Sequence, residues 1–109
     1  MSTRDALRTF KPKVHSFEHG GQTLFVKALS GAGRAKFMEL CKDGAPKMGK
    51  VVALGLCDED GTLVYSVENT KDVEEIDAID GAALQAIVFK LYEISGLTAK
   101  AIEEAEKNS

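Results

Sequence analysis

The sequence has little of what exported, membrane-spanning or disulfide-rich proteins contain. Its 109 residues include two cysteines and no tryptophan. Cys41 and Cys57 stand too far apart for a CxxC metal knuckle, and two cysteines do not form a disulfide framework. The longest apolar run, residues 51–57, is far shorter than the roughly 20 residues that span a membrane, and no signal-peptide stretch follows Met1. We therefore expect a soluble, unexported protein with two thiols.

The motifs of common reaction chemistries are also missing. The sequence contains no Gly-x-Ser-x-Gly elbow, and Ser30-Gly-Ala-Gly lacks the lysine and the spacing of a phosphate loop. Aligning the glycine of Asp58–Gly61 with that of a calcium-binding loop places Leu56 and Val67 where acids are required. The two histidines and two cysteines lack the compact spacing of zinc ligands. We expect no enzyme activity, no metal and no cofactor.

Charge is divided unevenly along the chain. Residues 1–57 carry ten Lys or Arg and four acids, a balance of +6, whereas residues 58–109 carry four Lys and thirteen acids, a balance of −9. The basic residues are dispersed and no RNP-like aromatic box occurs, so we expect no nucleic-acid partner. The asymmetry is compatible with two halves that fold against each other, or with copies that associate through contacts weakened by salt.

With 44% apolar and 28% charged residues, the composition predicts one α+β domain over residues 1–109. Two pairs of β-rich runs, each joined by a turn sequence, predict two β-hairpins that form a small sheet. Gly20-Gly21 supplies the positive φ angles of the first turn, and the acidic Asp58–Gly61 forms the second. A short apolar run does not fix its own period, so a buried helix over 48–56 is the alternative for one strand. The predicted strands are residues 14–19, 22–28, 50–57 and 62–66.

The first half also contains two predicted helices. Thr3 is a candidate cap for two helical turns that end before Pro12, because the residue preceding a proline is disfavoured in the α region. Ser30 can cap a second helix that ends near residues 43–46. Because glycine lowers helix propensity, we expect the regular part of this helix to begin at Gly33 or Arg34.

The last third is predicted to be all helical. A polar helix begins at Asn69 or Thr70 and ends near residue 79, and its acidic side chains favour a solvated face over a docking surface. Asp80 caps the main core helix over residues 81–95, which carries a wide apolar stripe. Thr98 caps a short polar helix over residues 99–107.

Three sequence features follow one another in a characteristic order. They are the step Leu29-Ser-x-x-x-Arg34, an apolar run before Asp58-Glu-Asp-Gly61, and Ile94-x-Gly-Leu-Thr with a terminal Ile102-Glu-Glu-Ala-Glu-Lys-Asn108. In order and spacing, over most of the chain, this pattern resembles the tail assembly chaperones of long-tailed, siphovirus-type bacteriophages. Each motif is structural, so the resemblance depends on the motifs taken together.

The resemblance implies a protein that binds the phage tape measure protein and promotes assembly of the tail tube protein around it. Such a protein acts in the cytoplasm of the bacterial host and is absent from the mature virion. Leu97 and Ile102 are then candidate partner-binding residues. The codons of Glu106, Lys107 and Asn108 can contain the heptamer A-AAA-AAC, where the resemblance implies a ribosomal frameshift that adds a C-terminal extension. Reading these codons tests that hypothesis.

Two other functions remain open at this point. One is a small cytoplasmic regulatory or interaction domain of a prophage or a toxin-antitoxin-type system, and the other is a metal-dependent enzyme fragment that uses the histidines. A tape measure gene directly downstream would favour the chaperone over the regulator. Metal analysis of the purified protein would test the enzyme.

Overall fold

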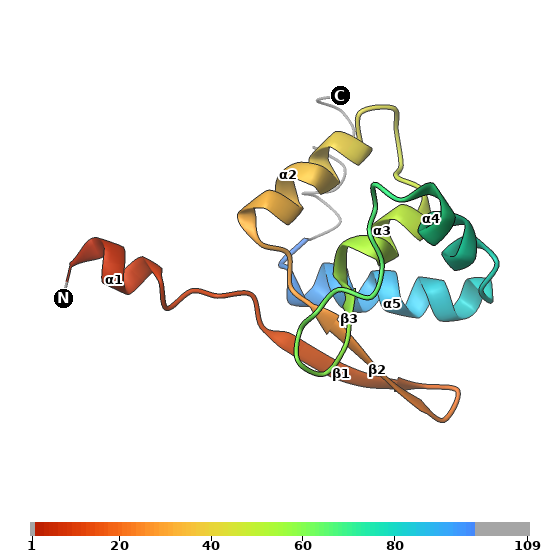
Figure 1. Ribbon diagram of the computed structural model, residues 1–109, viewed down its shortest axis with the longest axis horizontal. Coiled ribbons are helices and arrows are strands. Elements are labelled where there is room, and N and C mark those ends of the chain that lie inside the picture. The colour runs from red at the N-terminus through yellow and green to blue at the C-terminus, as the bar shows by residue number, and fades with distance from the viewer. Residues whose placement is uncertain (1, 98–109) are drawn as a thin grey trace.

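A three-stranded antiparallel sheet and the helices that pack beside it give this chain an α+β fold, as the sequence predicts (Figure 1). The computed structural model describes residues 2–97. The elements of this part of the chain are α1 (Thr3–Leu7), β1 (Val14–His19), β2 (Gln22–Lys27), α2 (Gly31–Leu40), α3 (Met48–Gly55), β3 (Leu56–Cys57), α4 (Thr70–Asp77) and α5 (Gly81–Ile94).

The sheet has the strand order β1-β2-β3 and is built around the first predicted hairpin. Its two-residue turn places Gly20 at φ 58° and Gly21 at φ 78°, a left-handed conformation that glycine adopts without a steric penalty. The register runs from the pair Val14 and Lys27 to the pair next to the turn. β3 then pairs antiparallel with β2 through Phe25 and Cys57. The prediction of the first hairpin is therefore confirmed.

The second predicted hairpin is wrong along most of its first strand, because residues 48–55 form the helix α3. This helix packs against both α4 and α5 and buries residues all around its axis, so tertiary contacts override the β propensity of its valines. Part of the hairpin remains at its turn, where Cys57 bridges to Leu63 and Val64 N donates to Leu56 O at 3.1 Å. The alternative of a buried helix over 48–56 is the correct one.

Side-chain caps mark the starts of α1, α2, α4 and α5, whereas α3 begins after Lys47 without a side-chain cap. Asp80 caps α5 as predicted, and α4 begins at Thr70, one of its two predicted starts, with Asn69 as its cap; both caps accept from backbone N–H groups of the first turn. Ser30 caps α2, which begins at Gly31 rather than at Gly33 or Arg34. Glycine is tolerated there because the cap satisfies an N–H group of the first turn, Gly33 N to Ser30 Oγ at 3.1 Å. The cap of α1 is Ser2 and not Thr3.

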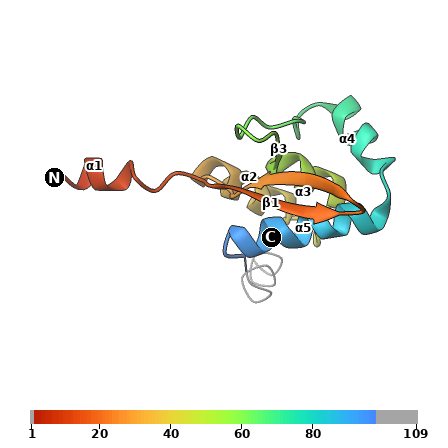
Figure 2. The same ribbon diagram turned by 90° about the horizontal axis from the view of Figure 1, so that it is seen from below.

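The core lies between the sheet and the helices (Figure 2). α5 contacts β1 and β2, and α3 packs against α5. α5 is the main core helix, as predicted, with four of its residues buried. The buried apolar residues form one cluster, consisting of Val26, Phe37, Cys41, Val51, Val52, Ala53, Ile76, Leu84, Ile87, Val88, Leu91 and Leu97.

The first residues of the described chain stand away from this core. α1 and the extended residues after it project from the body as an arm (Figures 1 and 2). None of the five residues of α1 is buried. We call residues 2–13 the N-terminal arm.

Candidate functional site

An open groove lies beside the step from β2 to α2. Its volume is about 460 Å³, and its walls come from the root of the N-terminal arm, the first turn of α2, α3 and the loop before α4. Lys27 and Lys36 also line it. We call it the apolar groove, after its apolar lining residues Pro12, Ala28, Leu29, Ala32, Leu54, Leu63 and Val67.

One wall of the apolar groove is held in place by Ser95, the residue that ends α5. Leu29 N donates to Ser95 Oγ at 3.0 Å, and the Arg34 guanidinium donates to the Ser95 carbonyl oxygen at 2.7 Å. A cation is favourable at this position because the C-terminus of a helix carries a partial negative charge. The motif Leu29-Ser-x-x-x-Arg34 thus ties the β2–α2 step to the end of α5.

The opposite wall is positioned by the acidic turn. Asp58 N donates to Thr62 O at 2.9 Å and closes the turn. Thr62 N donates to Asp60 Oδ1, also at 2.9 Å, which holds the pKa of the Asp60 carboxyl below its ordinary value. The turn presents Leu63 and Val64 with 45% of each side chain exposed. Large apolar side chains therefore face the solvent beside the groove.

An ion pair lies at the edge of the apolar groove. Lys36 Nζ on α2 is 2.5 Å from Glu68 Oε1, in the loop that precedes α4. The hydrogen bond between them raises the pKa of Lys36 and lowers the pKa of Glu68. Both side chains are solvent-exposed to a considerable degree, so the pair adds little to stability. It joins the α2 side of the groove to the loop.

A second hollow of about 450 Å³ continues the apolar groove, since the two share Leu54, Leu63 and Val67. Its wall contains Asp72, whose Oδ2 accepts from Ser66 N at 2.9 Å. The Tyr65 hydroxyl in the lining donates to Glu75, and this bond raises the pKa of Tyr65. Carboxylates of α4 therefore border a lining that is otherwise mostly apolar. We call this region the acidic hollow; its lining is Ala53, Leu54, Leu63, Val64, Tyr65, Ser66, Val67 and Asp72.

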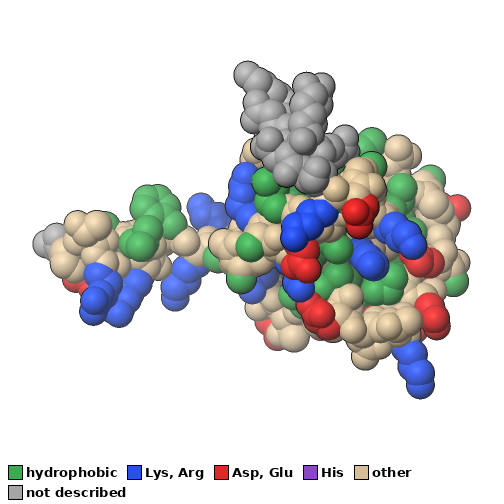
Figure 3. Space-filling model, turned by 90° about the horizontal axis from the view of Figure 1, so that it is seen from above, with side chains coloured by type: hydrophobic (Ala, Val, Ile, Leu, Met, Phe, Trp, Pro, Cys, Tyr) green, Lys and Arg blue, Asp and Glu red, His purple; other side chains and the backbone are tan. Residues whose placement is uncertain are grey.

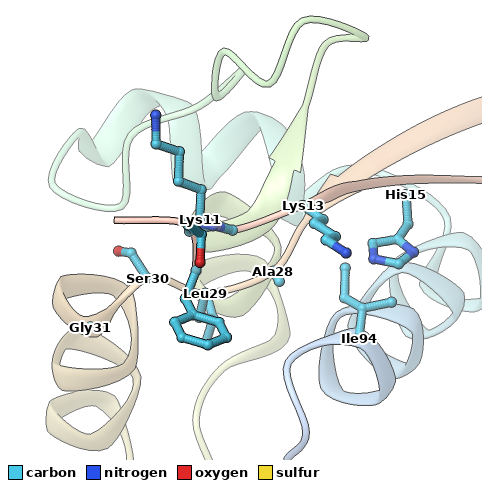
Figure 4. A pocket seen from close by; sticks show the side chains of 11 residues that line it. Lys11, Lys13, His15, Ala28, Leu29, Ser30, Gly31 and Ile94 are labelled. Carbon is cyan, nitrogen blue, oxygen red and sulfur yellow. The ribbon is translucent and has the colours of Figure 1, made fainter. Parts of the chain in front are cut away.

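A third hollow, of about 580 Å³, lies at the root of the N-terminal arm (Figure 4). Lys13 and His15 approach Ile94 at one end, and Ser30 and Gly31 mark the start of α2 at the other. The Ser30 hydroxyl is engaged as the cap of α2. Lys11 and Lys13 make this root basic, so the charge changes sign between the arm root and the acidic hollow.

Of the two residues predicted from the sequence to contact a partner, Leu97 lies within the part of the chain that the structure describes. Leu97 is 7% exposed and belongs to the core cluster, so its side chain is not presented at the surface. Ile102 and the residues of the predicted frameshift codons, Glu106, Lys107 and Asn108, lie outside the described residues. The exposure of Leu63 and Val64 was not predicted from their sequence. The available signal was an apolar pair directly after a polar turn.

The thiols lie in the interior. Cys41 and Cys57 are both buried, and burial raises the pKa of the Cys57 thiol, which makes it a weaker nucleophile at neutral pH. Within residues 2–97, no three His, Cys, Asp or Glu side chains gather where they could hold a metal ion. In the same part of the chain, each helix is too short or too polar to cross a membrane.

Comparisons of the chain with protein-family models, with curated proteins and with solved structures give no match.

Proposed function

We propose that this protein is a phage tail assembly chaperone that binds the tape measure protein in the host cytoplasm and is absent from the mature virion. The observation that carries the proposal is the open apolar groove bordered by the exposed Leu63. The sequence motifs that resemble the family support it, because Leu29, Arg34 and the acidic turn build the two walls of this groove.

The proposed role follows from the chemistry of the groove. A long helical protein exposes apolar stripes until its partners cover them, and such surface promotes aggregation. A groove with apolar walls can accept side chains that recur along one helix face. Lys27 and Lys36 at its edge offer contacts to acidic or carbonyl groups beside the stripe. Binding of this kind is reversible, so the tail tube protein can replace the chaperone.

The proposal assigns the client contact to the groove rather than to Leu97, whose side chain is in the core. A frameshifted C-terminal extension, encoded from the codons of Glu106, Lys107 and Asn108, would add a second contact with the client. It would follow residues beyond α5, whose end is tied to the groove wall through Ser95. The extension and the groove would then act on the same client.

The test is a binding measurement between the full chain and the tape measure protein encoded beside it. Ala32→Glu places a carboxylate in the apolar groove, on an exposed position of α2 where it disturbs no buried contact. We expect it to weaken binding by roughly tenfold or more, because a charge must then be desolvated against an apolar client.

Ala35→Glu is the matched control. It makes the same substitution at another exposed position of α2, away from the groove lining, and should leave the affinity unchanged. If the wild-type chain does not bind the tape measure protein, the chaperone proposal is wrong. If both variants bind as the wild type does, the groove is not the binding site.

A further inference from the structure

The N-terminal arm presents large apolar side chains that are exposed among the described residues, 2–97. Leu7 is 68% exposed and Phe10 is 80% exposed. Figure 3 shows the arm standing out from the body with basic and hydrophobic side chains along it. Within the described chain α1 has five residues, and a helix this short is unstable in water without tertiary contacts. The arm therefore has the features of a segment that packs against another surface.

The charge of the arm indicates what that surface is. Residues 2–13 contain Arg4, Arg8, Lys11 and Lys13 but one acid, Asp5. Residues 58–80 contain nine acids and one lysine. Most of the lining of the acidic hollow comes from this segment, which adds the carboxylate of Asp72 to the apolar walls, and Ala53 and Leu54 of α3 complete it. A basic segment with exposed apolar side chains complements it in both respects.

The direction of the arm favours a hollow on another molecule. Lys11 precedes Pro12 and is therefore biased toward an extended conformation, and the arm leads away from the body (Figures 1 and 2). Folding back along its own groove would bring the basic arm beside Lys27, which carries the same charge, whereas the charge of Lys36 at that edge is balanced by Glu68. The acidic hollow of a second molecule imposes no such repulsion.

We infer that the N-terminal arm of one copy of this chain docks into the acidic hollow of a second copy. Phe10 and Leu7 supply the apolar anchors, and the walls around Val64 and Tyr65 receive them. The arm's cations lie against the carboxylates of α4. The contact joins two different surfaces, so each copy offers one arm and one hollow. This association does not depend on the identity of the client.

The experiment is a complementation test with the full chain, followed by light scattering or sedimentation. Phe10→Ser removes the anchor and Val64→Ser weakens the hollow, and both side chains are exposed enough for the fold to survive. We expect each variant alone to have a dissociation constant raised roughly tenfold or more. A mixture of the two should regain association, because one partner keeps an intact hollow and the other an intact arm.

Two controls accompany the variants. Thr9→Ser lies next to the anchor and keeps the hydroxyl that donates to Ala6 O. Phe89→Ser removes an exposed apolar side chain of α5 that lines neither the groove nor the acidic hollow. Both should associate as the wild type does, and circular dichroism should show that all four variants are folded.

Three results would overturn the inference. The first is a wild-type chain that stays monomeric at low salt, whether its arm is free or folded back on its own body. The second is a mixture of the two variants that associates no better than either alone. The third is an assembly whose affinity is the same at low and at high salt, since screening over a Debye length of about 8 Å near physiological ionic strength should weaken these charge contacts.

Discussion

At the residue scale, the spacing between α3 and α5 depends on one glycine. A Cβ at Gly55 would lie 2.5 Å from Leu91 Cδ1 and 2.9 Å from Leu91 Cδ2, and Leu91 is fully buried. We predict that Gly55→Ala lowers the free energy of unfolding by about 1–3 kcal/mol, because overpacking outweighs the better helix propensity of alanine. Urea unfolding measures this.

Gly81→Ala is the control for this prediction. A Cβ at Gly81 would point into open space: apart from its chain neighbours and the backbone of its own helix, every heavy atom of the described residues lies more than 4 Å away. Its unfolding free energy should change by less than about 1 kcal/mol, with stabilisation as the expected sign. Equal stability of the two variants would mean that α3 and α5 do not pack closely at Gly55.

The ion pair between Lys36 and Glu68 predicts a pH dependence. The pKa of Glu68 is lowered in the folded protein, so its contribution to stability is present above the ordinary value of 4.5 and is lost as the pH falls through the folded value. The pKa of Lys36 is raised above 10.5, so its contribution is lost only at alkaline pH. An NMR titration of Glu68 should show a higher pKa in Lys36→Met. Lys42→Met, which changes an exposed lysine after α2, should leave the pKa of Glu68 unchanged. If neither substitution changes the pKa of Glu68, the ion pair with Lys36 does not form.

At the element scale, α5 and the β2–α2 step are joined through Ser95. Ser95→Ala removes the acceptor of Leu29 N, and a partly buried N–H group without a partner is costly. We expect a loss of about 1–2 kcal/mol in unfolding free energy and faster hydrogen exchange at the Leu29 amide. Ser66→Ala, whose hydroxyl accepts an exposed bond from Glu68 N, should cost less than about 0.5 kcal/mol. If the Leu29 amide exchanges at the wild-type rate in Ser95→Ala, the hydrogen bond does not link these elements.

At the scale of the whole molecule, charge and shape are arranged along the same direction. The arm and its root are basic. The turn Asp58–Gly61, the loop between this turn and α4, and α4 itself are acidic. The Cα radius of gyration, 14.3 Å, exceeds the roughly 13 Å expected for a compact chain of this length. The projecting arm accounts for part of this difference. One chain therefore carries both a basic projection and an acidic surface, as the inferred association between two copies requires.

The sequence by itself determined the features that depend on neighbouring residues. Gly20-Gly21 fixed the first hairpin, because few other residues adopt its positive φ angles. Asp80 fixed the start of α5 through a bond that spans three residues, and Ser30 was identified as the cap of α2, although the regular part of that helix was expected to begin at Gly33 or Arg34. The apolar stripe of residues 81–95 identified the main core helix, because its period is that of one helix face.

Only the tertiary structure decided what depends on contacts between distant segments. Residues 48–55 are apolar except for Lys50 and form too short a run for their period to distinguish a strand from a helix. Packing against α4 and α5 selected the helix. The burial of Leu97 and the exposure of Leu63 and Val64 were undetermined for the same reason. Both depend on where the acidic turn and the end of α5 lie relative to the rest of the fold, and residue type alone does not specify that position.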